Sequence, residues 1–353
     1  MTTSPSTVST VSTIGEAMVV LLPESQLPVA EAREYRTGVG GAEFNVASSL
    51  ARLGVPTHWI SRLGDDGFGD YVLDTARHDG VLVDAVERDD TRPTGLYVKE
   101  TVVAEDGDRR PRMHYYRSGS AASVLGPATL HHATTRTAIG ASAIVHTTGI
   151  TPALSASTAE LVGGLSAALA PGAVLSVDLN FRPRLWEGRS TAPLHRLLDQ
   201  ASVLFLGVDE AELFFGHADA GRLFAELPAL RRIVRKDEAN VATTIHRDDQ
   251  AAGTEVRSLA VDVVETVGAG DAFAAGYLAG LATGFTDAAC TRLGHAVAAS
   301  TLICHGDRPE LVPDTDGIST IVEADEAQWA SWRISPDIPL PWTTATAQGM
   351  IDA

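Results

Sequence analysis

The sequence is poor in basic residues. It contains 27 Lys and Arg against 45 Asp and Glu, which gives a formal net charge of -18. Nucleic acids and anionic membranes are bound through clustered positive charge, so we expect neither as a main partner. A small phosphate ligand remains compatible with this balance, because backbone amides and a few arginines are enough to bind one.

Cysteines and long apolar runs are also scarce. Cys290 and Cys304 are the only cysteines in 353 residues, and neither they nor the histidines have the spacing of a disulfide framework or a metal site. No apolar run reaches the roughly 18–20 residues of a membrane-spanning helix. Residues 1–12 lack the basic and apolar regions of a signal peptide, so we expect a flexible tail on a cytoplasmic protein.

What the sequence does contain is an alternation of strand-like and helix-like segments. Apolar runs of strand length lie at 13–22, 57–63, 143–147, 173–180 and 202–206, with helical spacing between most of them. This order is typical of an α/β domain with a mostly parallel sheet between helices. The chain is long enough for such a domain to bury a substantial core.

The alternation is interrupted once and fades at the end of the chain. Segments 96–102 and 112–117 are polar-apolar strands on either side of a charged turn at 105–110, which is the pattern of a hairpin. We expect this hairpin to close over a polar ligand. From about residue 332 onward the weak periodicity predicts a tail that is extended or partly disordered.

Residues 265–273 read Glu-Thr-Val-Gly-Ala-Gly-Asp-Ala-Phe and predict a glycine turn that opens a helix. Such a helix start offers free N–H groups and a positive dipole to an anion. Asp271 would be unfavourable beside a bound anion unless it takes part in chemistry, and it is placed to accept a proton from a hydroxyl that attacks a phosphoryl group. The alternative is an ordinary turn, because short glycine motifs often match by chance.

A second glycine turn strengthens the first. Residues 40–47 read Gly-Gly-Ala-Glu-Phe-Asn-Val-Ala, and together with 268–273 they resemble the two signatures of the ribokinase-like (PfkB) carbohydrate kinases. The resemblance covers most of residues 13 to 312. Within the family, residues 115–121 and 178–186 are similar to the 2-keto-3-deoxygluconate kinases.

This resemblance implies a fold and a domain plan. The fold is a ribokinase-like three-layer αβα sandwich, with a mostly parallel central sheet and a small β-sheet lid. The kinase domain would span residues 13–315, with lid segments near 16–36 and 92–117. Residues 316–353 would form a C-terminal extension.

The resemblance also implies ATP-dependent phosphorylation of 2-keto-3-deoxygluconate at its 6-hydroxyl, with Mg²⁺. Asp271 would be the catalytic base, and Gly268, Ala269 and Gly270 would stabilise the transferring phosphoryl group. The remaining implied roles are sugar binding by Gly40, Gly41, Asn45, Tyr97, Tyr115, Arg117, Arg182 and Asp307; nucleotide binding by Asn180, Arg235, Gly268 and Gly270; and contact with Mg²⁺ through water by Glu210. A homo-oligomer, a dimer or larger, is also implied, while a role for a monovalent cation stays open.

Arg117 and Arg182 favour an acidic sugar, because a guanidinium binds a carboxylate through two parallel hydrogen bonds and a neutral sugar has no such need. The alternative for Arg182 is a surface arginine after a strand. The alternative for Tyr97 and Tyr115 is cross-strand packing within the hairpin.

Three segments depart from the family pattern. Glu265 stands where Asp is usual, and residues 207–210 keep Glu210 but lack the usual Asn before it. Residues 234–241, Val-Arg-Lys-Asp-Glu-Ala-Asn-Val, carry side chains where a lysine is usually followed by spaced glycines. Two alternatives therefore stay open: a kinase for fructose or another sugar acid, and a non-catalytic sugar- or nucleotide-binding relative.

Overall fold

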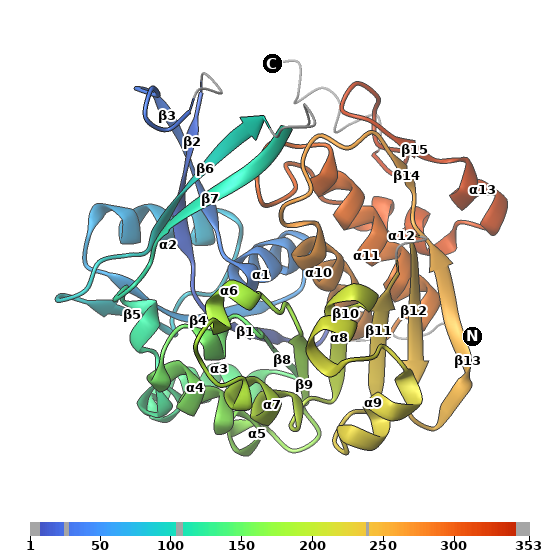
Figure 1. Cartoon of the computed structure of the whole chain (residues 1–353). Coiled ribbons are helices and arrows are strands. Elements are labelled where there is room, and N and C mark those ends of the chain that lie inside the picture. Colours follow the sequence, from blue (N-terminus) through green and yellow to red (C-terminus); the bar gives the residue numbers. More distant parts are fainter. Residues whose placement is uncertain (1–7, 25–27, 104–108, 238–239, 344–353) are drawn as a thin grey trace.

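The computed structural model describes residues 8–24, 28–103, 109–237 and 240–343 (Figure 1). In this part of the chain a nine-stranded sheet has the order β13-β12-β11-β10-β9-β8-β1-β4-β5. Its strands are β1 (Val11–Ile14), β4 (Thr57–Gly64), β5 (Val86–Asp89), β8 (Ile144–Thr148), β9 (Val174–Asp178), β10 (Val203–Gly207), β11 (Arg232–Lys236), β12 (Val241–His246) and β13 (Asp249–Arg257). Pairing is parallel from β5 to β11 and antiparallel at β12 and β13.

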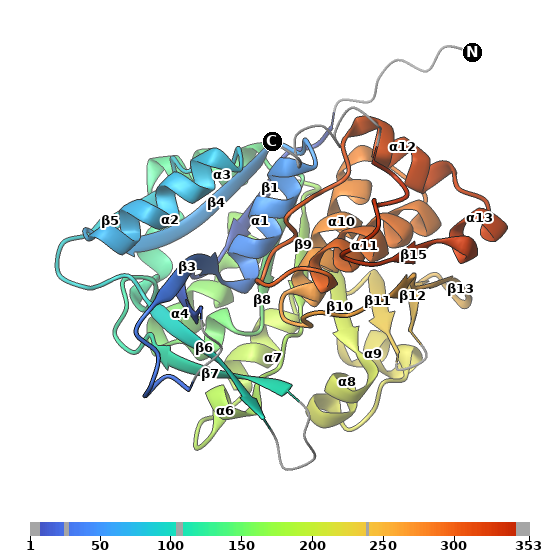
Figure 2. The same ribbon diagram turned by 90° about the horizontal axis from the view of Figure 1, so that it is seen from above.

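Helices cover both faces of this sheet, as Figures 1 and 2 show. They are α1 (Ala42–Arg52), α2 (Gly67–His78), α3 (Ala133–Ala141), α4 (Ala156–Gly163), α5 (Leu165–Ala168), α6 (Pro183–Trp186), α7 (Ala192–Leu198), α8 (Val208–Phe215), α9 (Ala220–Glu226), α10 (Ala269–Thr283), α11 (Asp287–Leu302), α12 (Thr315–Glu323) and α13 (Glu326–Ser331), with short 3₁₀ turns at Ala122–Val124, Pro127–His131 and Thr151–Ala153. None of the helices in the described ranges has the length and hydropathy that crossing a bilayer would require.

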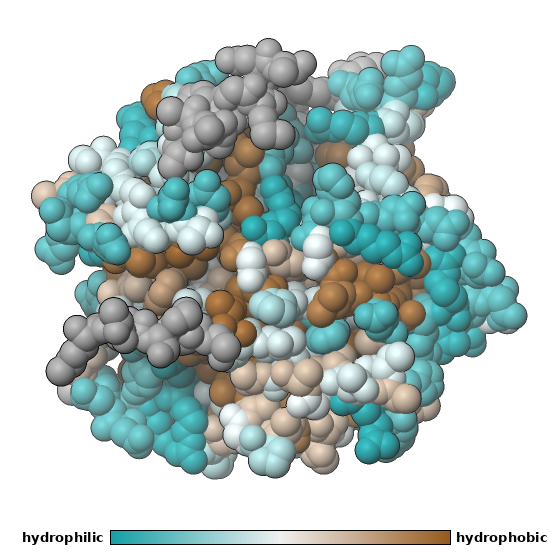
Figure 3. All heavy atoms as spheres, turned by 180° about the vertical axis from the view of Figure 1, so that it is seen from behind, coloured by the Kyte–Doolittle hydropathy of each residue, from teal (hydrophilic) through white to brown (hydrophobic). Residues whose placement is uncertain are grey.

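Each central strand serves two cores because successive side chains point to opposite faces. On β10, Phe205 packs with α10 and α11, whereas Leu204 and Leu206 pack with α4 and α7. The strands are therefore apolar on both sides, and the polar residues gather at their carboxyl ends. Seen from behind, the surface is mostly hydrophilic at its edge, and hydrophobic side chains gather in smaller areas toward the middle (Figure 3).

A separate four-stranded sheet forms the lid, in the order β3-β2-β6-β7. Its strands are β2 (Met18–Pro23), β3 (Tyr35–Gly40), β6 (Leu96–Val103) and β7 (Arg109–Tyr116). Strands β6 and β7 pair antiparallel, as the hairpin pattern predicts, and β2 joins them to β3. Figure 1 shows these strands projecting from the α/β body. The charged turn of the predicted hairpin falls mostly outside the described residues.

Two element predictions near the start of the chain and in its middle are wrong in detail. The apolar run 13–22 is two strands, because the chain leaves the central sheet after β1 and enters the lid as β2. Val11 and Ser12, expected in the tail, are buried in β1, and residues 1–7 lie outside the described part. The helical segment predicted between the strands at 143–147 and 173–180 is divided into α4 and α5 at Gly164.

The C-terminal segment is also more ordered than its periodicity predicts. Strand β15 (Arg333–Ile334) pairs in parallel with β14 (Ala260–Val261), and the Trp342 side chain is only 2% exposed. Aromatic and aliphatic side chains of the extension join the core around α10 and α11. Such irregularly spaced anchors leave no helical or strand period in the sequence. Residues 344–353 lie outside the described part.

Candidate functional site

The site is built around the start of α10. Gly268, the N-cap residue, has φ 82°, a conformation that glycine adopts without strain. A Cβ atom at this position would also lie 2.0 Å from the backbone oxygen of Asp307. The glycine is therefore required both by the turn and by the close approach of the 305–308 loop.

Backbone amides converge at this helix start. No partner is recorded in the described ranges for the N–H groups of Gly268, Gly270 and Asp271, and the N–H of Ala269 makes only a long 3.4 Å contact with the oxygen of Thr266. Free amides at the positive end of a 15-residue helix form a site for an anion. Gly268, Ala269 and Gly270 thus lie where the sequence predicts a phosphate site.

Asp271 lies in the first turn of α10, beside these amides. Burial raises the pKa of Asp271, to about 7, against the hydrogen bond from Asn45, and the nearby carboxylates of Asp178, Glu43 and Asp307 contribute to this shift. That hydrogen bond runs from Asn45 Nδ2 to Asp271 Oδ2 over 2.8 Å. A carboxylate with this pKa can accept and release a proton near neutral pH.

A polar cavity of about 580 Å³ opens in front of Asp271, between the strand ends and the lid. It brings together most of the predicted sugar-site residues. Its lining includes Glu16, Gly41, Glu43, Asn45, Tyr97, Tyr115, Arg117, Asp178, Asn180, Arg182, Glu210, Lys236, Gly268, Gly270, Asp271 and Asp307.

The lid contributes through β6. Tyr97 is only 3% exposed, and its hydroxyl donates to Asp307 Oδ2. Lys99, two residues farther along the strand, is equally buried and donates to Asp307 Oδ1 over 3.0 Å. Gly40 makes this arrangement possible, since a Cβ atom there would lie 2.3 Å from the Tyr97 hydroxyl oxygen. Gly40 therefore shapes the site from beneath these side chains.

The second lid strand contributes Tyr115 and Arg117. The Tyr115 side chain is 54% exposed at the cavity edge, and its ring centre lies 5.4 Å from that of Tyr97. Arg117 forms an ion pair with the buried carboxylate of Glu16, which also accepts a 2.5 Å hydrogen bond from Ser120 Oγ. Most of the Arg117 charge is therefore balanced within the protein.

Arg182 is placed differently. It is exposed, follows β9 as the N-cap residue of α6 and lines the cavity, and no partner for its guanidinium is recorded in the described ranges. Asn180, two residues before it, adopts a left-handed conformation with φ 39°, and its buried Oδ1 has no partner recorded in the described ranges. The turn after β9 thus presents a free guanidinium and an unsatisfied amide oxygen to the cavity.

Glu210 and Lys236 also line the cavity. Glu210 accepts hydrogen bonds from the backbone N–H groups of Phe181 (2.5 Å) and Gly207 (3.4 Å). Burial and the Asp178 carboxylate raise the pKa of Glu210 to about 6, although Lys236 opposes the shift. In the described part of the chain no group of three or more His, Cys, Asp or Glu side chains could hold a metal ion by itself.

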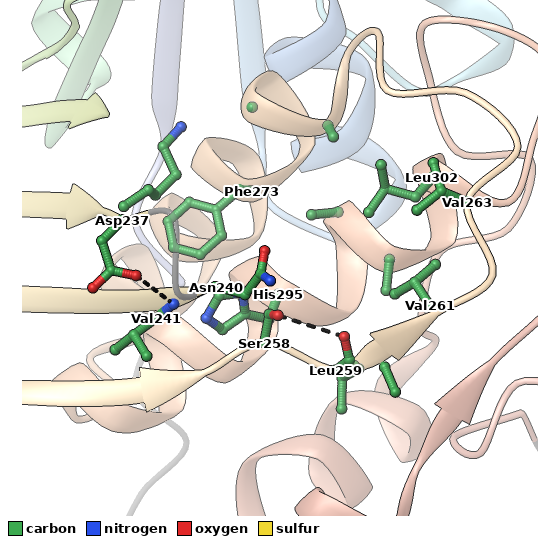
Figure 4. Close-up of a pocket in the computed structure, with 16 residues that line it drawn as sticks. Asp237, Asn240, Val241, Ser258, Leu259, Val261, Val263, Phe273, His295 and Leu302 are labelled. Atoms are coloured by element: carbon green, nitrogen blue, oxygen red, sulfur yellow. Dashed lines mark hydrogen bonds between the residues drawn. The ribbon is translucent and has the colours of Figure 1, made fainter. Parts of the chain in front are cut away.

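A second, mostly apolar cavity of about 450 Å³ lies on the other side of the α10 start (Figure 4). Its wall includes Phe273 from α10, His295 from α11 and Val261 from β14. Lys236 and Gly270 line both cavities, so the two meet at the anion site.

The altered segment 234–241 forms part of this second wall. Asn240 takes φ 59°, a left-handed conformation that asparagine tolerates better than most residues. Asp237 Oδ1 accepts a 2.9 Å hydrogen bond from the N–H of Val241 and closes the turn. Asp237 and Asn240 thus bring side chains to a segment where the family pattern has spaced glycines.

Arg235, predicted to bind the nucleotide, lines neither cavity. Its Nη1 donates to the backbone oxygen of Ala218 over 3.3 Å. The next residue, Lys236, points to the opposite face of β11 and reaches the junction of the cavities, with Nζ 5.6 Å from the centre of the Phe273 ring. The structure therefore places Lys236, and not Arg235, at the two cavities.

Sequence reasoning also missed Lys99 and Glu43. Glu43 is buried and accepts hydrogen bonds from the N–H and hydroxyl of Thr148 and from the Thr151 hydroxyl, so it fixes the α1 start against β8. Burial raises the pKa of Glu43. Its position inside the first glycine signature was a usable signal. Lys99 alternates with Tyr97 along β6, and that period of two could have identified it.

Comparisons with known proteins agree with this geometry. The model of the pfkB family carbohydrate kinases matches residues 8–314. The 2-dehydro-3-deoxygluconokinase of Bacillus subtilis is 32% identical over 326 residues, covering 88% of this chain and 95% of that protein. The 2-dehydro-3-deoxygalactonokinase of Haloferax volcanii is 30% identical over 316 residues, covering 86% and 93%. A crystal structure from Escherichia coli in complex with ATP and Mg²⁺ has a TM-score of 0.77 at 23% identity, covering 89% of this chain and 99% of that one.

The structural likeness confirms the predicted three-layer fold with its small separate sheet. The family match and the relatives confirm the predicted class of enzyme, a phosphotransferase that acts on an alcohol group of a sugar. The fold, the two glycine signatures and the relatives all lead to one conclusion. The chain belongs to the pfkB family of carbohydrate kinases.

Proposed function

We propose that this enzyme transfers the γ-phosphate of ATP to the 6-hydroxyl of 2-keto-3-deoxygluconate, the sugar acid also called 2-dehydro-3-deoxygluconate. The observation that carries the proposal is the position of Asp271. Its carboxylate lies at an anion site, between a polar cavity with a free guanidinium and an apolar cavity of a size suited to a nucleoside. The name of the Bacillus subtilis relative supports the choice of sugar.

The residues divide the work as follows. The sugar binds in the polar cavity with its primary hydroxyl toward Asp271, which accepts the proton as the hydroxyl oxygen attacks phosphorus. The amides of Gly268 and Gly270 stabilise the charge on the transferring phosphoryl group. The adenine and ribose occupy the apolar cavity beside Phe273, and Lys236 lies between the two cavities to meet the phosphates.

Selection of an acid rests on Arg182. Arg117 is already paired with Glu16, whereas Arg182 has no recorded partner in the described ranges and faces the cavity. A substrate carboxylate that pairs with Arg182 converts a solvated positive charge into a charge-assisted pair. A neutral sugar such as fructose gains no such pair, so we expect it to be a poorer substrate.

The residues present also fit Mg²⁺. In phosphoryl-transfer enzymes this ion keeps several waters and needs only one or two carboxylates besides the phosphates. Glu210, acting through water, and the unsatisfied Oδ1 of Asn180 would supply protein oxygens near the junction of the cavities. When bound, Mg²⁺ neutralises charge on the phosphates. Activity in K⁺ compared with Na⁺ tests whether a monovalent cation also takes part.

We further propose a cytoplasmic homo-oligomer, a dimer or larger, assembled through the lid. The need for ATP and two unpaired cysteines support the location. Tyr116 on β7, 63% exposed, offers an aromatic surface for lid pairing. Light scattering after size-exclusion chromatography tests the assembly, and a monomer at micromolar concentration would refute it.

A coupled ADP-release assay tests the function. The panel is 2-keto-3-deoxygluconate, 2-keto-3-deoxygalactonate, fructose, ribose and gluconate, each with Mg-ATP, and Asp271→Asn serves as the blank. We expect the keto-deoxy acids to give the highest kcat/KM. Preference for the galactonate would move the assignment toward the activity named for the Haloferax volcanii relative. Turnover of a neutral sugar alone would refute the acid site.

A further inference from the structure

Only two of the 27 basic Lys and Arg residues in this sequence are lysines, Lys99 and Lys236. Lys236 stands at the junction of the two cavities. Lys99 lies on strand β6 of the lid and lines neither of these cavities. In a chain that otherwise uses arginine, a compact ammonium at this buried position points to a specific need for its size and charge.

Lys99 joins three parts of the molecule. Its Nζ lies 2.7 Å from Glu265 Oε2 and 3.0 Å from Asp307 Oδ1, and the side chain is only 3% exposed. Glu265 begins the glycine loop that presents the anion site, and Asp307 is a predicted sugar ligand. Lys99 itself belongs to β6 of the lid. One ammonium therefore connects the lid, the phosphate loop and the sugar loop.

The two loops also touch directly. A Cβ atom at Gly268 would lie 2.0 Å from the backbone oxygen of Asp307, so the loops have no room between them. Without the ammonium, the carboxylates of Glu265 and Asp307 would face each other with no positive charge between them. Buried like charges repel strongly when they are unpaired. The expected result is separation of the two loops at the contact that Gly268 makes.

The unusual Glu265 fits this interpretation. An aspartate at the same place would be one methylene shorter and would withdraw the carboxylate by about 1.5 Å. The longer side chain reaches the Lys99 ammonium at 2.7 Å. Glu265, which departs from the family pattern, and the buried Lys99 thus form one ion pair.

We propose that Lys99 is a positioning residue that couples lid closure to the geometry of the phosphoryl-transfer loop by holding Glu265 and Asp307 together. The proposal rests on the sugar-kinase function proposed above. It assigns Lys99 no direct contact with substrate. It predicts that removal of the ammonium damages sugar binding and the chemical step together, and spares the nucleotide cavity.

The kinetic test uses Lys99→Met and the control Thr101→Val, which lies two residues farther along the same strand and has no ionic partner in the described ranges. We expect Lys99→Met to lower kcat at least tenfold and raise the KM for the keto acid at least fivefold, with the KM for ATP changed less than twofold. The double variant Lys99→Met/Glu265→Gln should recover part of the lost kcat because it removes one unpaired carboxylate. Wild-type kcat and KM in Lys99→Met would overturn the proposal.

A labelling experiment separates this proposal from the proposed function and from simple misfolding. In the folded wild-type protein, an amine-selective acylating reagent should modify Lys99 at least tenfold more slowly than the N-terminal amine, as followed by peptide mass spectrometry. Glu265→Gln should increase the rate at which Lys99 is acylated, while the melting temperature stays within a few degrees of the wild-type value. Rapid labelling of wild-type Lys99 would overturn the proposal, even if the enzyme turned over the keto acid. If Lys99 is labelled slowly in a protein that phosphorylates no sugar, the proposed function is refuted, while the ion pairs of Lys99 with Glu265 and Asp307 are supported.

Discussion

The two cavities that meet at the start of α10 are built in different ways. On the side proposed for the sugar, buried charges are already paired: Lys99 with Glu265 and Asp307, and Arg117 with Glu16. On the side proposed for the nucleotide the wall is mostly apolar, and Asp237 and Asn240 lie in its lining. A site made from paired charges holds its geometry before substrate arrives, and that preorganisation is what phosphoryl transfer requires.

The difference also explains which departures from the family pattern the fold absorbs. In the proposed assignment an adenine ring needs mainly apolar contacts, and this wall keeps them although Asp237 and Asn240 stand among its lining residues. The sugar side has less freedom, because one altered charge leaves others unpaired. The following changes should therefore have unequal effects on the two substrates.

Asp271→Asn should have the largest effect. Loss of the base lowers kcat by about 10²–10⁴-fold, the usual contribution of general base catalysis. Binding of the keto acid, measured by calorimetry, should change less than about threefold, since the amide keeps the shape of the side chain. The control is Asp316→Asn, another aspartate in the first turn of a helix, which should leave kcat unchanged. Near-wild-type turnover by Asp271→Asn would contradict the mechanism.

Arg182→Ala should act on the sugar side alone. Loss of a charge-assisted pair, about 1.5–3 kcal/mol, lowers kcat/KM for the keto acid by roughly 10- to 100-fold. The KM for ATP and the residual turnover of fructose should stay near their wild-type values. Arg184→Ala is the matched control, because Arg184 is exposed two residues away and does not line the cavity. If Arg182→Ala lowers kcat/KM equally for the keto acid and for fructose, Arg182 does not select the acid.

The pH profile should report Asp271. Burial raises the pKa of this carboxyl to about 7, and only its deprotonated form accepts a proton. The value of kcat/KM should therefore rise about tenfold per pH unit below 7 and level off above it. A profile that is flat down to pH 5 would mean that another group limits the reaction.

Phe273→Leu should have a smaller effect, confined to the nucleotide side. The Phe273 ring lines the apolar cavity and contacts the Lys236 ammonium. Its loss should raise the KM for ATP by about three- to tenfold and leave the KM for the keto acid unchanged. Phe285→Leu, outside both cavities, is the control for packing. A change in the KM for the keto acid would show that the two sides are not independent.

The smallest effect should be on stability. The pKa of Asp271 is higher in the folded chain than its ordinary value of 3.8, so the unfolded state releases this proton first. The carboxyl therefore destabilises the fold increasingly as the pH rises from about 4 to about 7, and fully above that. Asp271→Asn should then raise the free energy of unfolding by about 1–2 kcal/mol at pH 8, because solvent screens part of the charge of this partly exposed side chain. Near pH 4 the variant and the wild-type protein should have about the same free energy of unfolding. Urea denaturation at both pH values measures it, and a loss of stability at pH 8 would contradict the assigned cause.

The sequence was sufficient for the sheet, the hairpin and the helix starts, because glycine turns and apolar runs leave local signals. It placed Asp271 and Gly268 together at the start of one helix, since that arrangement depends on neighbouring residues in the chain; their catalytic roles stay a prediction. Pairings between distant segments left no such signal. Lys99 reaches Asp307 across 208 positions, and no local pattern records that distance.

Two further errors have a similar origin. Arg235 and Lys236 are adjacent, and the phase of a short buried strand decides which one faces the cavity; apolar residues on both sides of β11 hide that phase. The C-terminal extension is held by single buried aromatic residues, among them Trp329 and Trp342, and by the short pairing of β14 with β15. Isolated anchors of this kind have no period to recognise.

The most direct test is a ³¹P NMR spectrum of the wild-type enzyme with Mg-ATP and 2-keto-3-deoxygluconate. The account predicts one new phosphomonoester signal, coupled to the two protons on C6, that grows at the rate at which ADP appears. Consumption of ATP with only inorganic phosphate as product, or no consumption at all, would contradict it.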